Sequence, residues 1–140
     1  MPLWNIYHSR DAFTDEQKQD FANDITRFYA RLGLPDFYVV AAFHEVPESS
    51  FFVGATKADR TVRIVVEHLA RHVEDPRRRE KMAENLNAVM APHTLDRGLY
   101  LEFHIDETPR DLWLIAGMRP PGPGTEAEKL WVRENRPVPY

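Results

Sequence analysis

The chain has no cysteine, which excludes a disulfide scaffold, a thiolate zinc site and a cysteine nucleophile. No apolar run approaches the ~20 residues that a membrane-spanning helix needs, and the first ten residues lack the basic and apolar regions of a secretory signal. The chain also has no excess of positive charge: its net charge of −4 does not favour nucleic acid as a partner, because phosphate contacts need a basic face. We therefore expect a soluble cytoplasmic protein, folded as one domain over 1–140, with neither a nucleic-acid nor a membrane partner.

Hydrophobic periodicity and turn signals predict four main strands and two main helices. The strands are expected over 2–8, 37–43, 61–69 and 99–105. The first helix begins after Thr14, which forms a capping-box pattern with Gln17, and ends near Gly33. The second begins at Asp75-Pro76, where a cap precedes a proline at the first helical position.

The order strand-helix-strand occurs twice, which predicts an α/β fold built from two β-α-β units. Parallel strands within each unit and one helix per unit give a four-stranded mixed sheet with both helices on one face. The run FYVVAAF at 37–43 is apolar at every position, which indicates a strand covered on both faces and hence an oligomer that covers the second face. A proline-rich tail from about 118 is expected to end in a short helix over 127–134.

Several segments resemble the tautomerase superfamily, in particular the branch that includes cis-3-chloroacrylic acid dehalogenase. They are Pro2 at the head of the first strand, FHEVPESSFFVG at 43–54, TVRIVVEHLAR at 61–71 and LYLEFHIDETP at 99–109. The resemblance implies a homotrimer that uses no cofactor or metal and acts on a small carboxylate or carbonyl substrate.

The resemblance also implies that Met1 is removed, so that Pro2 becomes a secondary amine. A neutral amine can take a proton from one atom of an enol or keto acid and return it to another, which is tautomerisation. Burial in an apolar pocket or a nearby cation lowers the pKa of such an amine. If Met1 is retained, Pro2 is an amide without a basic nitrogen, and its position after Met1 is an ordinary chain start.

The chain departs from the dehalogenase pattern at residues that activate water in that enzyme. Arg71 matches the first of two arginines that bind the substrate carboxylate, whereas Glu74 lies near the place of the second. Tyr29 falls where the dehalogenase has a histidine, Glu102 where it has a tyrosine and Ile115 where it has a glutamate. The resemblance therefore implies a tautomerase or isomerase. Glu102 supplies a carboxylate at the same strand position, so hydration of an unsaturated acid stays an alternative.

Other candidate residues have both a functional and a structural interpretation. His68 lies near the end of the third strand, where it is either an acid or base near neutral pH or a hydrogen-bonded structural histidine. Trp113 either closes the pocket or packs in the core, and Arg71 either binds a carboxylate or forms a surface ion pair. Glu102 lies either on an inward strand face, where an unpaired carboxylate would be costly, or on a face that is simply wet. Tyr29, on the apolar stripe of the first helix, either packs in the core or contributes to the pocket.

Three alternatives to a proline-based tautomerase remain open. The first is a hydratase or dehalogenase of unsaturated acids. The second is a non-catalytic trimeric binding protein that keeps the fold. The third is a pathway isomerase whose base is His68 or Glu102 in place of Pro2.

Overall fold

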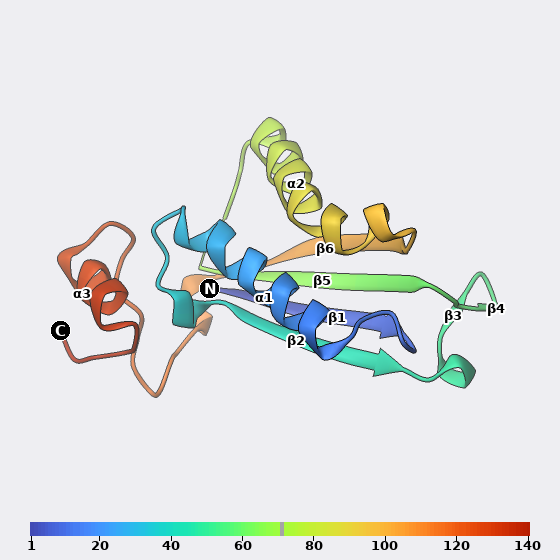
Figure 1. The fold of residues 1–140 in the computed structure, drawn as a ribbon. Helices are drawn as coiled ribbons and strands as arrows, with labels where there is room; N and C mark the ends of the chain where they lie inside the picture. Colours follow the sequence, from blue (N-terminus) through green and yellow to red (C-terminus); the bar gives the residue numbers. More distant parts are fainter. Residues whose placement is uncertain (71) are drawn as a thin grey trace.

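A computed structural model describes residues 1–70 and 72–140, and it confirms the predicted mixed sheet. The four strands are β1 (Pro2–Ser9), β2 (Val40–Val46), β5 (Thr61–Leu69) and β6 (Tyr100–Thr108), in the order β2-β1-β5-β6. The pairs β1/β2 and β5/β6 are parallel, and the central pair β1/β5 is antiparallel. Each parallel pair is one β-α-β unit, joined by α1 (Asp15–Ala30) or α2 (Pro76–Met90) (Figure 1).

Both helices begin at the caps that the sequence predicts. Thr14 and Gln17 form the reciprocal bonds of a capping box at the start of α1. Asp75 accepts a hydrogen bond from the backbone N–H of Arg77 at the start of α2, where Pro76 is the first helical residue. These caps fix where the two helices start and therefore which side chains face the sheet.

The main core lies between the two helices and one face of the sheet. Alternate residues of the two central strands are buried, because successive strand side chains point to opposite faces. The buried residues from strands and helices are Trp4, Ile6, Val62, Ile64, Val66, Phe21, Ile25, Tyr29, Leu86 and Met90. This packing places Tyr29 of α1 directly over the sheet.

The second predicted strand is shifted along the chain. Phe37 and Tyr38 belong to a 3₁₀ turn, η1 (Asp36–Tyr38), and β2 begins only at Val40. The strand is at an edge of the sheet and is partly exposed, with Val40 39% accessible, so the expected burial of both faces is not found in one chain. The proline before η1 sets the turn, and the two aromatic rings pack against the C-terminal segment instead of the sheet.

The uncovered face of the sheet is more polar than the sequence prediction implied. Arg63 of β5 lies 3.6 Å from the Glu102 carboxylate and 2.7 Å from His104, both on β6. Beyond this face, two short strands, β3 (Phe52–Val53) and β4 (Thr56–Lys57), form a hairpin whose apolar residues Phe52 and Val53 are exposed. Figure 1 shows this hairpin at one end of the sheet and the N-terminus at the other.

The C-terminal segment folds back toward the N-terminal end of the sheet (Figure 1). It contains a 3₁₀ turn, η5 (Arg110–Leu112), and a short helix, α3 (Glu126–Glu134), close to the predicted 127–134. Trp131 of α3 is fully buried and its indole N–H donates to the carbonyl of Val138. Within the described ranges, no helix is long and apolar enough to cross a bilayer.

Candidate functional site

Pro2 is the first residue of β1. It is buried, and in the antiparallel pairing of β1 with β5 it lies opposite His68. The residue before it, Met1, continues the strand pairing by two bonds to Leu69. The amino group of Met1 donates to the Leu69 carbonyl at 2.9 Å, and the Leu69 backbone N–H donates to the Met1 carbonyl at 2.8 Å. The pairing of Met1 with Leu69 and the opposition of Pro2 to His68 therefore hold Pro2 against the end of β5.

Tyr29 and His68 form a buried hydrogen-bonded pair beside Pro2. The hydroxyl oxygen of Tyr29 lies 2.7 Å from Nε2 of His68 and accepts a hydrogen bond of 3.2 Å from the indole N–H of Trp4. Tyr29 is 4% exposed and His68 7% exposed. An indole N–H can only donate, so the bond from Trp4 orients the phenol toward the histidine. The sequence candidates Pro2, Tyr29 and His68 thus meet in space.

A pocket of about 280 Å³ opens in front of these three residues. Most of its wall is apolar and comes from the C-terminal half of α1, the end of β5 and one side of α2. The lining includes Pro2, Tyr29 and His68 together with Phe28, Leu32, Leu34 and Met82. A pocket of this size fits a small organic acid, and its apolar wall excludes most of the water around Pro2.

Two cations from α2, Arg78 and Lys81, also line this pocket. The sequence analysis missed both, because the run of arginines at 77–79 resembles an ordinary solvated helix face. The available signal was helical spacing: Arg78 lies four residues before Met82, on the same side of the helix as the apolar stripe. These cations form a cationic rim on the pocket, and each also has an acidic partner three residues away: Arg78 lies 3.9 Å from Asp75, and Lys81 lies 3.0 Å from Glu84.

Glu102 is not brought together with Pro2 in one chain. His68 lies beside Glu107 on β6, and Glu102 is five residues further back, roughly 17 Å along the strand at ~3.3 Å per residue. Its carboxylate is 56% exposed and lies 3.6 Å from Arg63. Of the two alternatives, the structure shows the wet one: Glu102 lies on the uncovered face of the sheet, and Leu101 and Phe103 take the sheltered side.

Of the other two predicted substrate-binding residues, Trp113 and Arg71, the structure describes only Trp113. Trp113 is buried and packs edge-on against Tyr38, with ring centroids 5.2 Å apart. It lines a separate cavity of about 30 Å³ that shares Met1, Leu34 and Leu69 with the first pocket. Arg71 lies outside the described residues. In the part of the chain that is described, no group of three or more histidine and acidic side chains is placed to hold a metal ion.

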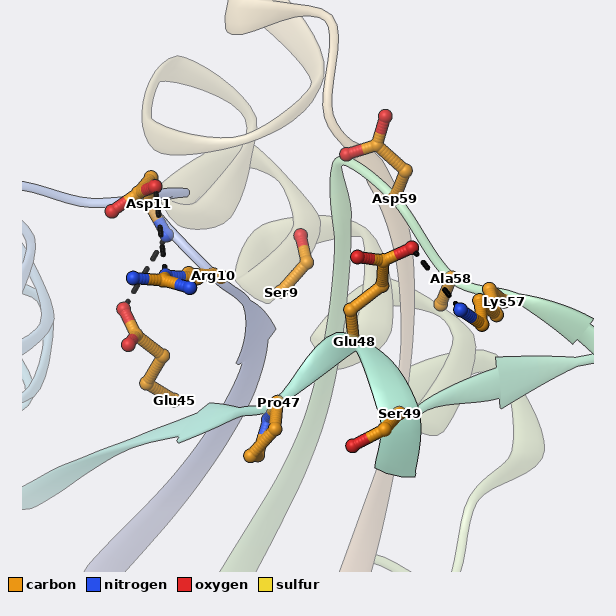
Figure 2. Close-up of a pocket in the computed structure, with 10 residues that line it drawn as sticks. All are labelled: Ser9, Arg10, Asp11, Glu45, Pro47, Glu48, Ser49, Lys57, Ala58 and Asp59. Carbon is orange, nitrogen blue, oxygen red and sulfur yellow. Dashed lines mark hydrogen bonds and ion pairs between the residues drawn. The ribbon is translucent and has the colours of Figure 1, made fainter.

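A larger hollow of about 770 Å³ lies at the opposite end of β1, roughly 23 Å from Pro2 at ~3.3 Å per residue. Figure 2 shows its charged side chains already engaged: Asp11 pairs with Arg10, Lys57 pairs with Glu48, and the Glu45 carboxylate accepts a hydrogen bond from the backbone N–H of Asp11. The side chains of Arg10 and Asp11 are 77% and 90% exposed. The hollow is therefore an open polar surface, whereas the pocket at Pro2 combines burial with reactive groups.

The fold and this pocket define the class of protein. A β-α-β pair in one mixed sheet, with a buried proline at the head of the first strand, is the architecture of the tautomerase superfamily. Residues 1–136 match a family described as "Putative oxalocrotonate tautomerase enzyme", and the chain belongs to that family. No curated protein matches the chain.

Solved structures share the fold of this chain. A protein from the thermophilic fungus Aspergillus fumigatus, described as a probable enzyme, is 40% identical with a TM-score of 0.94, over 100% of this chain and 98% of that one. RhCC from Rhodococcus jostii RHA1 is also 40% identical with a TM-score of 0.94, over 99% of both chains. A member of the cis-3-chloroacrylic acid dehalogenase family is 15% identical with a TM-score of 0.74, over 94% of this chain and 96% of that one, and shares the fold.

Proposed function

We propose that this protein is a cofactor-independent tautomerase or isomerase of a small keto-enol or unsaturated carboxylate. Pro2 is the general base and then the general acid. The observation that carries the proposal is the position of Pro2, buried beside the Tyr29–His68 pair at the wall of an apolar pocket with a cationic rim. Membership of a tautomerase family agrees with it.

Removal of Met1 is the first step of the proposed mechanism. It converts the Pro2 amide into a secondary amine and releases the Leu69 backbone N–H from the Met1 carbonyl that it now bonds at 2.8 Å. The amine and this N–H donor then lie side by side at the pocket. The apolar wall and the cations Arg78 and Lys81 both disfavour the protonated amine, so they lower its pKa toward neutrality.

The proton transfer itself needs only this chain's own groups. The Pro2 nitrogen accepts the proton of the enol hydroxyl, negative charge develops on the substrate oxygen, and the same nitrogen returns the proton to carbon. The Leu69 N–H is placed to stabilise the charged oxygen. Arg78 and Lys81 bind the substrate carboxylate, and Arg71 remains the sequence candidate for the same task.

Tyr29 and His68 have a positioning role in this proposal. Their hydrogen bond of 2.7 Å, fixed by the indole of Trp4, presents one polar edge to the pocket beside Pro2. Such an edge orients the substrate carbonyl so that the proton reaches the carbon from one face of the enol plane. Glu102 takes no part within one chain, because it lies further back along β6, beside Arg63 and away from His68.

Ketonisation of phenylenolpyruvate, followed at several pH values, tests the proposed function. We expect turnover by the processed protein and at least a 100-fold loss in protein that retains Met1, because its Pro2 nitrogen is an amide and a positioned general base typically contributes 10²–10⁴-fold. A 3-haloacrylate is assayed in parallel for halide release. Faster halide release than ketonisation would reject the tautomerase proposal in favour of a hydratase or dehalogenase.

A further inference from the structure

The small cavity behind Met1 contains a buried polar group that the proposed reaction does not use. Tyr38 is 3% exposed, and its hydroxyl has no hydrogen-bond partner among residues 1–70 and 72–140. A buried hydroxyl without a partner costs free energy of folding, so such groups are rare unless they serve a ligand or hold a water molecule. This hydroxyl belongs to a residue that lines the cavity of about 30 Å³.

Met1 separates this cavity from the pocket at Pro2. Met1, Leu34 and Leu69 line both spaces, whereas Arg78 and Lys81 line only the first pocket. The order along the combined space is therefore the α2 cations, then Pro2, then Met1, and last the small cavity with Tyr38. Loss of Met1 removes one of the three side chains that line both spaces and leaves Leu34 and Leu69.

The C-terminal segment builds the far wall of the small cavity. Arg110, Trp113 and Glu128 line it, and Figure 1 shows this segment at the N-terminal end of the sheet. The wall is tied in place: the Arg110 guanidinium donates to the Pro120 carbonyl, and the Glu128 carboxylate accepts from the Gly124 backbone N–H at 2.6 Å. The cavity is thus a built compartment with fixed polar groups.

We propose that the cavity at Tyr38 is a distal substrate subsite that becomes connected to the Pro2 pocket when Met1 is removed. This inference rests on the proposed function. A substrate whose carboxylate binds Arg78 and Lys81 and whose reacting carbons lie at Pro2 extends its other end toward Tyr38. The substrate class is a 2-oxo acid or its enol that carries an oxygen acceptor at the end remote from the carboxylate.

The Tyr38 hydroxyl is suited to donate to that remote oxygen. Burial, with Glu128 as a further cause, raises the pKa of Tyr38 far above its ordinary value, so the phenol keeps its proton at all physiological pH values. Its ring is fixed edge-on against Trp113 at 5.2 Å. A neutral, immobile O–H donor discriminates strongly between ligands that have an acceptor and ligands that lack one, because in the second case it stays unpaired.

Binding of two non-reacting ligands tests the subsite independently of catalysis. The probes are 3-phenylpropanoate and 3-(4-hydroxyphenyl)propanoate, measured by titration calorimetry with the processed protein. We expect the hydroxylated ligand to bind about tenfold more tightly, and Tyr38→Phe to remove that preference while the affinity for 3-phenylpropanoate stays within twofold. Protein that retains Met1 is the matched control and should show no preference, because Met1 still separates the two spaces.

Tyr38→Phe removes only an oxygen that has no partner, so we expect the variant to melt at or above the wild-type temperature. Equal binding of both ligands by the processed wild-type protein would overturn the proposal and assign the hydroxyl to a trapped water molecule. If protein that retains Met1 ketonises the substrate as fast as the processed protein does, while the processed protein still shows the Tyr38-dependent preference, the subsite stands and the proline mechanism fails. The two proposals are therefore distinguished by separate readouts.

Discussion

The hydroxyl of Tyr29 connects the core of the protein to the chemistry proposed at Pro2. It accepts from Trp4 inside the core and meets His68 at the pocket wall. Such a residue fixes the orientation of its neighbours, but its buried hydroxyl needs hydrogen-bond partners. The Tyr29 hydroxyl has one on each side, Trp4 and His68. The same two hydrogen bonds therefore support both packing and the geometry of the site.

Tyr29→Phe tests this dual role. We expect kcat for enol ketonisation to fall about tenfold with a smaller change in KM, because His68 loses the group that orients it. Loss of the hydroxyl should also lower the free energy of unfolding by about 1 kcal/mol. Tyr7→Phe, at an exposed tyrosine of the same sheet, is the control. An unchanged kcat and pH profile in Tyr29→Phe would assign the hydroxyl to stability alone.

His8 carries a prediction about pH and stability. Its ring is fully buried against Phe13 and Phe43, Nδ1 bonds the Ser9 carbonyl, and Nε2 has no partner within the described residues. Burial lowers the pKa of His8 below 6.5 in the folded state. The unfolded chain therefore binds a proton that the folded chain refuses, and stability falls as pH drops below about 6.5 toward the folded pKa.

Urea unfolding of wild type and His8→Asn at pH 7.5 and pH 5.5 measures this contribution. We expect the wild type to lose more unfolding free energy between the two pH values than the variant does, since only the wild type has this titrating group. An equal loss in both proteins would show that His8 does not contribute to the acid sensitivity.

At the residue scale, the sequence predicted three of the groups that meet at the pocket: Pro2, Tyr29 and His68. It could do so because the family resemblance singled out Pro2 and Tyr29, and because His68 lies near a strand end. The face of Glu102 stayed open, because strict alternation shows which residues share a face but not which face is covered. Tyr38 was interpreted as a strand residue, and its buried hydroxyl becomes visible only with the tail in place.

Helix α2 contributes the cationic side of the pocket, and this assignment is testable by charge removal. Arg78→Ala and Lys81→Ala are each expected to raise KM for phenylenolpyruvate about three- to tenfold with little change in kcat, because they bind the carboxylate in the ground state and the transition state alike. Arg77→Ala, on an exposed residue of the same helical turn that does not line the pocket, is the matched control.

Equal effects of Arg77→Ala and Arg78→Ala would point to the overall field of the helix and contradict specific carboxylate binding. Raising the ionic strength helps to separate the two cases. A long-range field between exposed charges is screened within about 8 Å at physiological salt, whereas a direct contact in the pocket is screened much less.

At the element scale, sequence and structure agree where a local rule governs the boundary. Thr14, Gln17 and Asp75 predicted the helix starts because capping depends on neighbouring residues alone. The strand predicted over 37–43 began too early, since an apolar run does not reveal where a 3₁₀ turn ends and pairing starts. The return of the tail to the N-terminal end carries no periodic signal, because its contacts are with residues about 100 positions away.

At the scale of the whole molecule, the uncovered sheet face and the β3–β4 hairpin favour assembly. Phe52 and Val53 on the hairpin and Tyr7 and Tyr100 on the strands are exposed apolar groups. Together with membership of the tautomerase family, they support the homotrimer as the proposed state of this chain. A neighbouring chain in such a trimer would also cover Glu102 and its partner Arg63, which one chain leaves exposed.

Sedimentation of the wild-type protein should therefore give a mass of three chains. We expect Phe52→Glu to shift the equilibrium toward lighter species at low micromolar concentration, because it places a charge in the proposed contact. Leu112→Glu, at an exposed apolar residue near the other end of the sheet, is the control and should stay trimeric. A wild-type protein that sediments as a single chain would contradict the trimer.

The central claim is that the Pro2 nitrogen acts as an amine, and one comparison tests it without altering any side chain of the pocket. The proteins compared are the processed chain that begins at Pro2 and the same chain with one glycine before Pro2, both checked by intact mass. We expect kcat/KM for phenylenolpyruvate ketonisation to fall at least 100-fold in the extended chain, because its Pro2 nitrogen is an amide. Equal turnover by the two proteins would contradict the account and move the proton transfer to another group, with His68 the first to examine.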